Sequence, residues 1–184
     1  DATSGLVQMS PESENSMVLF DVLGARGSQI VLFGAGHVGH ALLAVLGTLP
    51  YGVTVIDDRA DRLPAGFPDN VDVRFSRAPE LEVAHVPPGS LCLVMTYSHA
   101  LDRKICGALL ARDDLPYVGL IGSASKRRSF ENYWRKNDME TSRMARLVCP
   151  IGLDGIGGKE PGMIAVAVAA QLINLIEAED KVHG

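Results

Sequence analysis

Residues 29–39 read Q-I-V-L-F-G-A-G-H-V-G, an apolar run that continues directly into three glycines. The apolar run predicts a buried strand, and the small, apolar segment 41–46 predicts that a helix follows the glycines. Gly34 permits a sharp turn, Gly36 lets a ligand phosphate approach the backbone, and Gly39 lets the helix pack closely on the strand. The first N–H groups of such a helix, at its positive dipole end, suit an anion.

Further apolar runs follow at intervals that suit a sheet with crossover helices. Strands are expected at residues 53–56, 71–75, 91–95 and 117–121. These runs are apolar throughout rather than alternating, and helical stretches separate several of them, which indicates a parallel sheet covered on both faces. The sequence therefore predicts an α/β fold: a Rossmann-like, doubly wound, mostly parallel sheet with helices on both faces.

The expected topology places distant loops together. In a doubly wound sheet, ligands bind beyond the carboxyl ends of the strands, at the point where the strand order reverses. The first and fourth strands would be neighbours there, so we expect the loops 34–39, 96–99 and 122–126 to line one crevice. Ser98 is a suitable N-cap for a helix over residues 99–112, and Gly122 begins a second glycine turn that opens a basic helix.

The remaining segments divide into a tail and the end of one domain. Residues 1–28 are expected to be an N-terminal tail or linker with one short apolar run at 17–23, and residues 29–184 a single Rossmann-like domain. Residues 139–147 have a helical pattern. Pro161 suits the first turn of a helix to about residue 178, apolar on nearly every face and so expected to be buried on most sides. Its polar residues interrupt it too early for a membrane span: Gln171, Asn174 and Glu177.

The net charge and the cysteines limit the expected binding partners and cellular location. The formal net charge of −5 disfavours nucleic acid or an anionic membrane as a partner. Cys92 and Cys106 lie in apolar runs and predict core thiols, which favours a reducing, cytoplasmic location. Residues 1–16 have neither a basic start nor an apolar run, so no signal peptide is expected. The first residue is not Met, which is compatible with an upstream portion.

An acidic pair ends the second predicted strand. Asp57 stands where a dinucleotide fold binds the adenosine ribose hydroxyls. It would also repel a 2′-phosphate, so a nicotinamide ligand would be NAD rather than NADP. The simpler alternative is that Asp57 caps the end of a strand. Its coincidence with three glycines favours the nucleotide interpretation.

No arrangement of a nucleophile, a base and an orienting acid is visible. Ser98, His99 and Asp102 form a local cap pattern, because Asp102 lies one helical turn along and not beyond the imidazole. We therefore assign no catalytic residue and no metal ligand, and expect no turnover from this chain alone.

Five segments stand in a specific order: V-L-F-G-A-G-H-V-G (31–39), I-D-D-R (56–59), V-M-T-Y-S-H-A-L-D (94–102), Y-V-G-L-I-G-S-A-S-K-R (117–127) and C-P-I-G-L-D-G-I-G-G-K-E-P (149–161). In this order they resemble the xanthine dehydrogenase accessory protein (XdhC/CoxI) family. The similarity covers roughly residues 29–176 and is to the family's C-terminal Rossmann-like domain. The usual N-terminal domain, which carries a cysteine associated with cofactor handling, has no counterpart in the first 28 residues.

The resemblance implies a molybdenum cofactor (molybdopterin) chaperone. Such proteins hold the mature cofactor, protect it while a cysteine desulfurase sulfurates it, and deliver it to a molybdenum hydroxylase such as xanthine dehydrogenase. The implied partners are these two enzymes and a second copy of the chain in a homodimer, without nucleic acid or membrane. The cofactor-binding residues are then expected to be Gly34, Gly36, His37, Val38, Gly39, Asp57, Thr96, His99, Gly122, Ser123 and Lys126.

Each polar candidate has an alternative role. His37 could be a half-exposed residue at a helix start, and His99 could hydrogen-bond a pterin edge or pack under the loop of Tyr97. Lys126 and Arg127 could contact phosphate or molybdate oxygens, whereas Arg127 could equally belong to a solvated helix face. Cys149 is either a soft ligand or, as we favour from its apolar approach, a structural thiol.

Two other classes of function share the glycine turn and Asp57. One is a small NAD-dependent oxidoreductase, although the sequence lacks a Tyr-x-x-x-Lys pair and an obvious acid at the hydride site. The other is a regulatory domain that senses a nucleotide without catalysis. Only the resemblance separates the chaperone from these alternatives.

Overall fold

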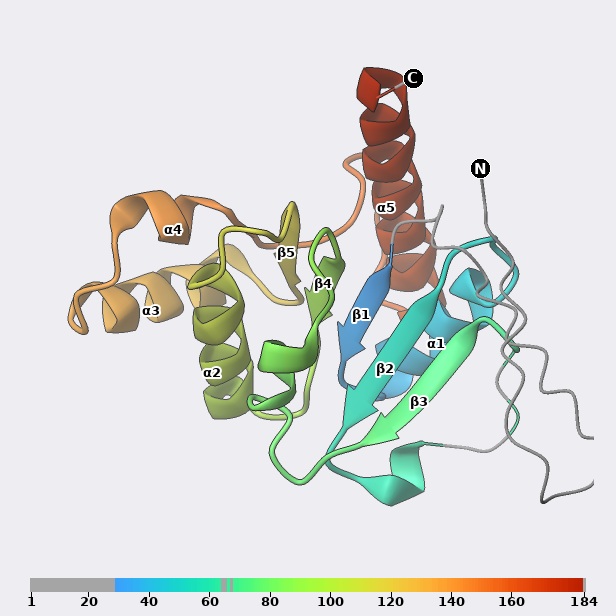
Figure 1. Ribbon diagram of the computed structural model, residues 1–184, viewed down its shortest axis with the longest axis horizontal. Coiled ribbons are helices and arrows are strands. Elements are labelled where there is room, and N and C mark those ends of the chain that lie inside the picture. The colour runs from blue at the N-terminus through green and yellow to red at the C-terminus, as the bar shows by residue number, and fades with distance from the viewer. Residues whose placement is uncertain (1–28, 64–65, 67, 184) are drawn as a thin grey trace, which may run out of the picture.

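The computed structural model describes residues 29–63, 66 and 68–183, and the expectations for residues 1–28 lie outside this part (Figure 1). Its strands are β1 (Ile30–Phe33), β2 (Val53–Asp57), β3 (Val71–Phe75), β4 (Leu91–Val94), β5 (Tyr117–Leu120) and β6 (Leu147–Val148). Its helices are α1 (His37–Leu46), α2 (His99–Leu110), α3 (Ala124–Arg135), α4 (Thr141–Ala145) and α5 (Pro161–His183), with the 3₁₀ turns η1 (Ala60–Arg62) and η2 (Glu82–His85).

The strands form one parallel sheet in the order β3-β2-β1-β4-β5-β6. This is the doubly wound order, with its reversal between β1 and β4. Phe33 is in register with Ile56 of β2 and with Val94 of β4. The three strands therefore end at the same level, and the turns that follow them share one edge of the sheet. The predicted fold class is confirmed.

Alternate residues of β1 point into two separate cores. Ile30 and Leu32 pack with α1 and α5 on one face of the sheet, and Val31 and Phe33 pack with α2 and α3 on the other. Figure 1 shows α1 and α5 behind the sheet and α2 to one side of it. Burial on both faces explains why the strands are apolar at every position.

The expected helix over residues 139–147 is wrong in part. The structure has a short helix, α4, and then the two-residue strand β6, in which Leu147 is in register with Val118 of β5. A two-residue strand is too short to carry a pattern of its own. It forms because the edge of β5 offers unpaired backbone groups to the next segment that passes it.

The expectation that α5 is buried on most sides is also wrong. Ala165, Val168 and Leu172 are fully buried, but Met163 and Val166 are 43% and 50% exposed. The helix packs on α1, and the N–H of Leu153 donates to the carbonyl oxygen of Ala167 at 2.9 Å. Within the described residues, the stretch Pro161–Ala178 of α5 is the one helix long and apolar enough to cross a membrane. This differs from the expectation that Gln171, Asn174 and Glu177 interrupt it too early for a membrane span. Its buried face belongs to the core around β1, and a core helix passes the same test.

Candidate functional site

Three glycines shape the turn between β1 and α1, each in a different way. Gly34 has φ +111°, and a Cβ on it would lie 2.5 Å from the carbonyl oxygen of Met95. A Cβ on Gly39 would lie 2.5 Å from the carbonyl oxygen of Gly34. Gly36 has φ −78° and would meet nothing within 4 Å. Gly34 and Gly39 are therefore needed for close packing, and Gly36 keeps open space at the start of the helix.

The beginning of α1 differs from the beginnings of the next two helices. Its N-cap, Gly36, has no side chain to accept a hydrogen bond, and its first turn contains no acidic residue. In α2 and α3, the hydroxyls of Ser98 and Ser123 accept hydrogen bonds from the N–H groups of Leu101 and Lys126. The first N–H groups of a helix lack intrahelical partners, so α1 presents donors and a positive dipole end that no cap of its own satisfies.

A cleft of about 340 Å³ lies at this end of α1. It is lined by Gly36, His37, Val38, Gly39, Arg59, Arg62, Met95, Thr96, Tyr97 and Ile121. The structure thus brings two of the three predicted loops together, the one after β1 and the one after β4. The third loop contributes Ile121 at its start, but its predicted residues Gly122, Ser123 and Lys126 are not in the lining.

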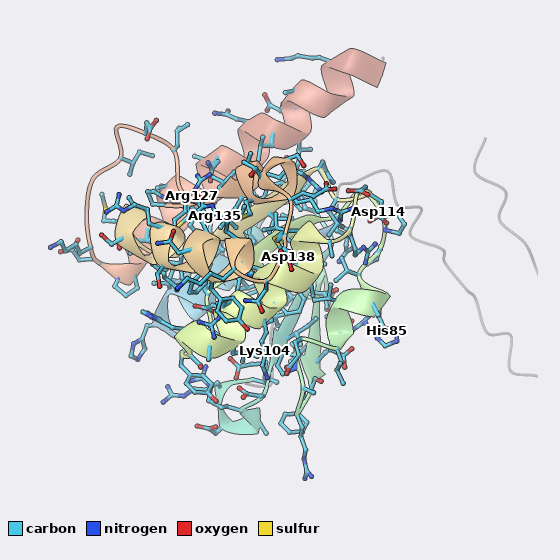
Figure 2. The ribbon with its side chains drawn as sticks, turned by 90° about the vertical axis from the view of Figure 1, so that its left-hand side faces the viewer. His85, Lys104, Asp114, Arg127, Arg135 and Asp138 are labelled. Atoms are coloured by element: carbon cyan, nitrogen blue, oxygen red, sulfur yellow. The ribbon has the colours of Figure 1, made fainter. Side chains whose placement is uncertain are left out.

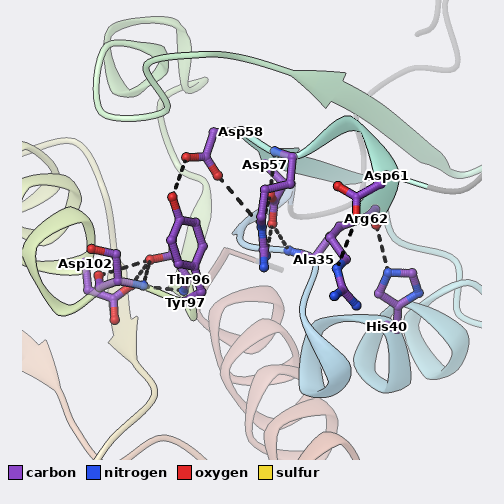
Figure 3. Close-up of polar contacts among 11 residues, drawn as sticks. Ala35, His40, Asp57, Asp58, Asp61, Arg62, Thr96, Tyr97 and Asp102 are labelled. Carbon is purple, nitrogen blue, oxygen red and sulfur yellow. Dashed lines mark hydrogen bonds and ion pairs between the residues drawn. The ribbon is translucent and has the colours of Figure 1, made fainter.

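Asp57 is at the carboxyl end of β2, but its carboxylate is already bonded within the chain. Oδ2 accepts from the N–H of Ala35 at 2.7 Å and from Arg59 Nη2 at 2.8 Å, and Oδ1 accepts from Arg59 N and Nε, both at 2.9 Å (Figure 3). The side chain is 2% exposed. Burial raises the pKa of Asp57, but the hydrogen bonds from Arg59 and Ala35 outweigh it and leave this pKa below its ordinary value.

Arg59 and Tyr97 connect the two lips of the cleft. The Arg59 guanidinium carbon lies 4.4 Å from the centre of the Tyr97 ring, and the Tyr97 hydroxyl donates to Asp58 Oδ2 at 3.0 Å (Figure 3). Arg62, in η1, is 47% exposed, and its carbonyl oxygen accepts from His40 Nε2 at 2.8 Å. Arg59 belongs to the segment I-D-D-R but was not among the residues predicted to form the site. An arginine two residues after a strand-end carboxylate was the available signal.

A buried ion pair lies beneath the loop after β4. Asp102 is fully buried, and its Oδ2 accepts from Lys126 Nζ at 2.6 Å. Its Oδ1 accepts from the backbone N–H of Thr96 at 2.9 Å and from the Thr96 hydroxyl at 2.7 Å (Figure 3). Lys126 Nζ also donates to the carbonyl oxygen of Ile121 at 2.9 Å. Asp102 is therefore more than the local cap partner that its spacing from Ser98 suggests.

The other predicted residues are at the margin of the cleft or outside it. His37, exposed at the first position of α1, lines the cleft, whereas His99, exposed at the first position of α2, is not in the lining. Gly122 has φ +152°, and a Cβ there would lie 2.5 Å from the Lys126 side chain, so this glycine makes room for the lysine. Arg127 lies on α3, where its Nε donates to Glu131 at 2.7 Å (Figure 2).

The cysteines are core groups. Cys92 and Cys106 are fully buried, as predicted; burial raises the pKa of Cys92 to about 12 and also raises that of Cys106. Cys149 is 7% exposed, and its Sγ donates to the Ser123 carbonyl oxygen at 3.7 Å. Burial raises the pKa of Cys149, while Lys126 and Arg127 act in the opposite direction. No cluster of three or more metal-ligating side chains is found among the described residues.

A larger hollow, of about 480 Å³, lies over β2 and β3. It exists because the connection from β3 to β4 contains only the short turn η2, so no full helix covers this part of the sheet. Its lining includes Asp69, Asp72 and Glu82, with Arg74 and His85. It shares no residue with the cleft at α1, and its carboxylates disfavour an anion. The smaller cleft at α1 is therefore the better candidate site.

Comparisons with known proteins agree with this geometry. Residues 30–172 match the family model of the XdhC Rossmann domain. The chain is 25% identical over 177 residues to the uncharacterized protein YqeB of Escherichia coli (strain K12), covering 95% of this chain and 32% of YqeB. A crystal structure described as a xanthine dehydrogenase from Bacillus halodurans has 25% identity and a TM-score of 0.69, covering 83% of this chain and 43% of that one.

The chain thus spans about a third of the curated relative and less than half of the Bacillus halodurans protein. The oxidoreductase ylbE from Lactococcus lactis, at 12% identity and a TM-score of 0.54, shares the fold alone and covers 79% of this chain and 84% of its own. The family match extends from β1 into α5 and includes every residue that lines the cleft. The chain therefore belongs to the XdhC family, and the part that the structure describes is its Rossmann domain.

Proposed function

We propose that this chain binds the molybdenum cofactor in the cleft at α1 and acts as an accessory protein in the maturation of a xanthine dehydrogenase-type molybdenum hydroxylase. The observation that carries the proposal is the family match, because it includes the whole cleft. The name of the Bacillus halodurans neighbour points to the same enzyme system.

The residues of the cleft fit the phosphate of such a cofactor. The uncapped first turn of α1 supplies N–H donors and a positive dipole end. Arg59 and Arg62, which are paired with Asp57 and Asp61, add guanidinium donors on the adjacent side of the cleft. Gly36 leaves the space through which a phosphate can reach the backbone. Thr96 and Tyr97 form the opposite lip, where Asp102 fixes the position of Thr96. The cofactor, when bound, supplies the molybdenum centre that the target hydroxylase uses.

The polar groups near the cleft favour binding of a ligand rather than catalysis. Ser98 is used as the cap of α2, and Asp102 is bonded to Thr96 and Lys126. Neither is arranged as part of a nucleophile and base pair. In this proposal the chain works in the cytoplasm as a homodimer. It holds the cofactor while a cysteine desulfurase sulfurates it and then passes it to the hydroxylase.

A matched pair of glycine variants tests this proposal. Gly36→Val places a side chain at the mouth of the cleft, where the backbone conformation is allowed and no atom lies within 4 Å. Gly162→Val makes the same change in the exposed first turn of α5, where the space is equally open. Each protein is mixed with purified molybdenum cofactor, passed through gel filtration, and assayed for retained pterin and for activation of a cofactor-free xanthine dehydrogenase.

Wild type and Gly162→Val are expected to retain the cofactor and activate the enzyme, and Gly36→Val to lose at least about tenfold in retention, because a blocked cleft forfeits the charge-assisted hydrogen bonds. The proposal fails if wild type retains no pterin, or if Gly36→Val retains as much as wild type.

A further inference from the structure

Asp57 occupies the position at which a dinucleotide-binding fold offers a carboxylate to the adenosine ribose. A carboxylate has about four lone-pair sites. Here four donors fill them: the N–H of Ala35 and three donors from Arg59. Since the side chain is 2% exposed, a ribose diol could bond to Asp57 only by displacing the Arg59 guanidinium.

Arg59 is itself held from two further sides. Its guanidinium stacks on the Tyr97 ring, and Asp58 Oδ1 lies 3.9 Å from its Nε. Asp58 in turn accepts from the Tyr97 hydroxyl. Arg59 is therefore one member of a closed set of contacts that joins the loop after β2 to the loop after β4. Displacing it would break the ion pair with Asp57 and the contact with the ring together.

The Asp57–Arg59 pair also changes the charge that a ligand meets. An unpaired carboxylate at the end of β2 would repel a phosphate, as expected from the sequence for a 2′-phosphate. In the structure, this carboxylate is neutralised by the Arg59 guanidinium. Arg59 and Arg62 both line the cleft, where Arg62 Nε lies 3.5 Å from Asp61 Oδ2, and no carboxylate side chain is among the described residues of the lining. The β2 end of the cleft therefore presents guanidinium N–H donors that suit phosphate oxygens, and its lining offers no carboxylate to a ribose.

We propose that Arg59 is a specificity-determining residue: it closes the ribose subsite of the fold and restricts the cleft to ligands bound through a phosphate or pyrophosphate group. This inference rests on the proposed function, because it takes the first turn of α1 as the place where the anion binds. A dinucleotide such as NAD then gains nothing from its adenosine ribose.

Isothermal titration with inorganic pyrophosphate and with NAD⁺ tests this assignment. The measured quantity is the ratio of the pyrophosphate Kd to the NAD⁺ Kd. We expect wild type to bind pyrophosphate with a ratio near or below one. Arg59→Ala frees the carboxylate for two ribose hydroxyls, so the ratio should rise by about tenfold or more. Arg62→Ala is the matched control: it removes a guanidinium from the same cleft without freeing Asp57, so it should weaken pyrophosphate binding but should not tighten the binding of NAD⁺, which only Arg59→Ala is expected to do.

Two more variants guard against misfolding of Arg59→Ala, which leaves a buried carboxylate with fewer partners. Arg59→Gln retains an amide donor for Asp57 and should raise the ratio in the same direction but less. The double variant Asp57→Asn, Arg59→Ala lacks the charged acceptor and should return the ratio toward one. Circular dichroism on each variant establishes that it is folded.

Three outcomes overturn the inference: wild type that binds NAD⁺ at least about tenfold more tightly than pyrophosphate, a ratio that no Arg59 variant changes, or no binding of pyrophosphate at all. The first two leave the chaperone role untouched, because that role is judged by cofactor retention. Conversely, if wild type does not retain the cofactor but the Arg59 variants change the ratio as expected, the chaperone role is rejected and the inference about Arg59 stands.

Discussion

Lys126 Nζ lies 2.6 Å from the carboxylate of Asp102, 24 residues earlier in the chain, and both side chains are almost fully buried. The pair joins the start of α3 to the first turn of α2. Through Asp102 it also holds the N–H and the hydroxyl of Thr96, a residue of the cleft. A buried cation and a buried anion that fix a loop in this way make the stability of the domain depend strongly on both partners.

Lys126→Met should therefore be strongly destabilising. The substitution leaves Asp102 buried without its cation, which is expected to lower the free energy of unfolding by about 3–5 kcal/mol. Urea denaturation followed by circular dichroism measures the loss. The control is Arg128→Met on the same helix, where the side chain is exposed and an effect within about 0.5 kcal/mol is expected. A Lys126 effect as small as that of Arg128 would show that the pair contributes little.

The glycines of the first turn should differ in their tolerance of alanine. Gly34→Ala combines a positive φ with a Cβ 2.5 Å from a carbonyl oxygen, and should lower the free energy of unfolding by about 2–4 kcal/mol. Gly36→Ala has neither problem and should stay within about 0.5 kcal/mol of wild type. Thermal and urea unfolding of the two variants side by side check this order. Equal losses would contradict it.

Acid should remove the contribution of Asp57 to stability. Its pKa in the folded protein is lowered from the ordinary value of 3.8, so the folded state favours the carboxylate and the contribution is fully present above that ordinary value. The contribution is lost as the pH falls from 3.8 through the folded-state pKa. We expect the stability difference between wild type and Asp57→Asn to be constant from pH 7 to about pH 5 and to shrink at lower pH. A difference that grows toward acid would reverse the sign of the assigned shift.

The thiols should differ in reactivity from one another. Raised pKa values and complete burial keep Cys92 and Cys106 protonated and inaccessible at neutral pH, so each should react with a disulfide reagent at least about 100-fold more slowly than a free thiol. Cys149 is less shielded and lies near two cations, so it should react first. Timed labelling with mass spectrometry of peptides gives the order, and denatured protein should label at all three sites. Labelling of Cys92 before Cys149 would contradict the burial described.

Much of the fold follows from local patterns in the sequence. The run from Ile30 to Phe33, with its glycines, is apolar because both faces of the strand are buried, and that requirement can be read from the residues themselves. Ser98 caps its helix as predicted, since a cap depends on groups within one turn. β6 was missed because Leu147 and Val148 become a strand only when the edge of β5 lies beside them.

The candidate site follows only in part from the sequence. The sequence by itself predicted the glycine turn and the fold class, and with them the edge of the sheet at which we expect a ligand to bind. Only the tertiary structure decided how the charges there are used: Asp57 bonds to Arg59, and Asp102 bonds to Lys126. The physical reason is that a buried carboxylate takes whichever donors surround it. Ala35 and Lys126 reach Asp57 and Asp102 from segments whose proximity depends on the packing of the whole sheet, and the same packing buries Asp57 so that the nearby Arg59 bonds to it.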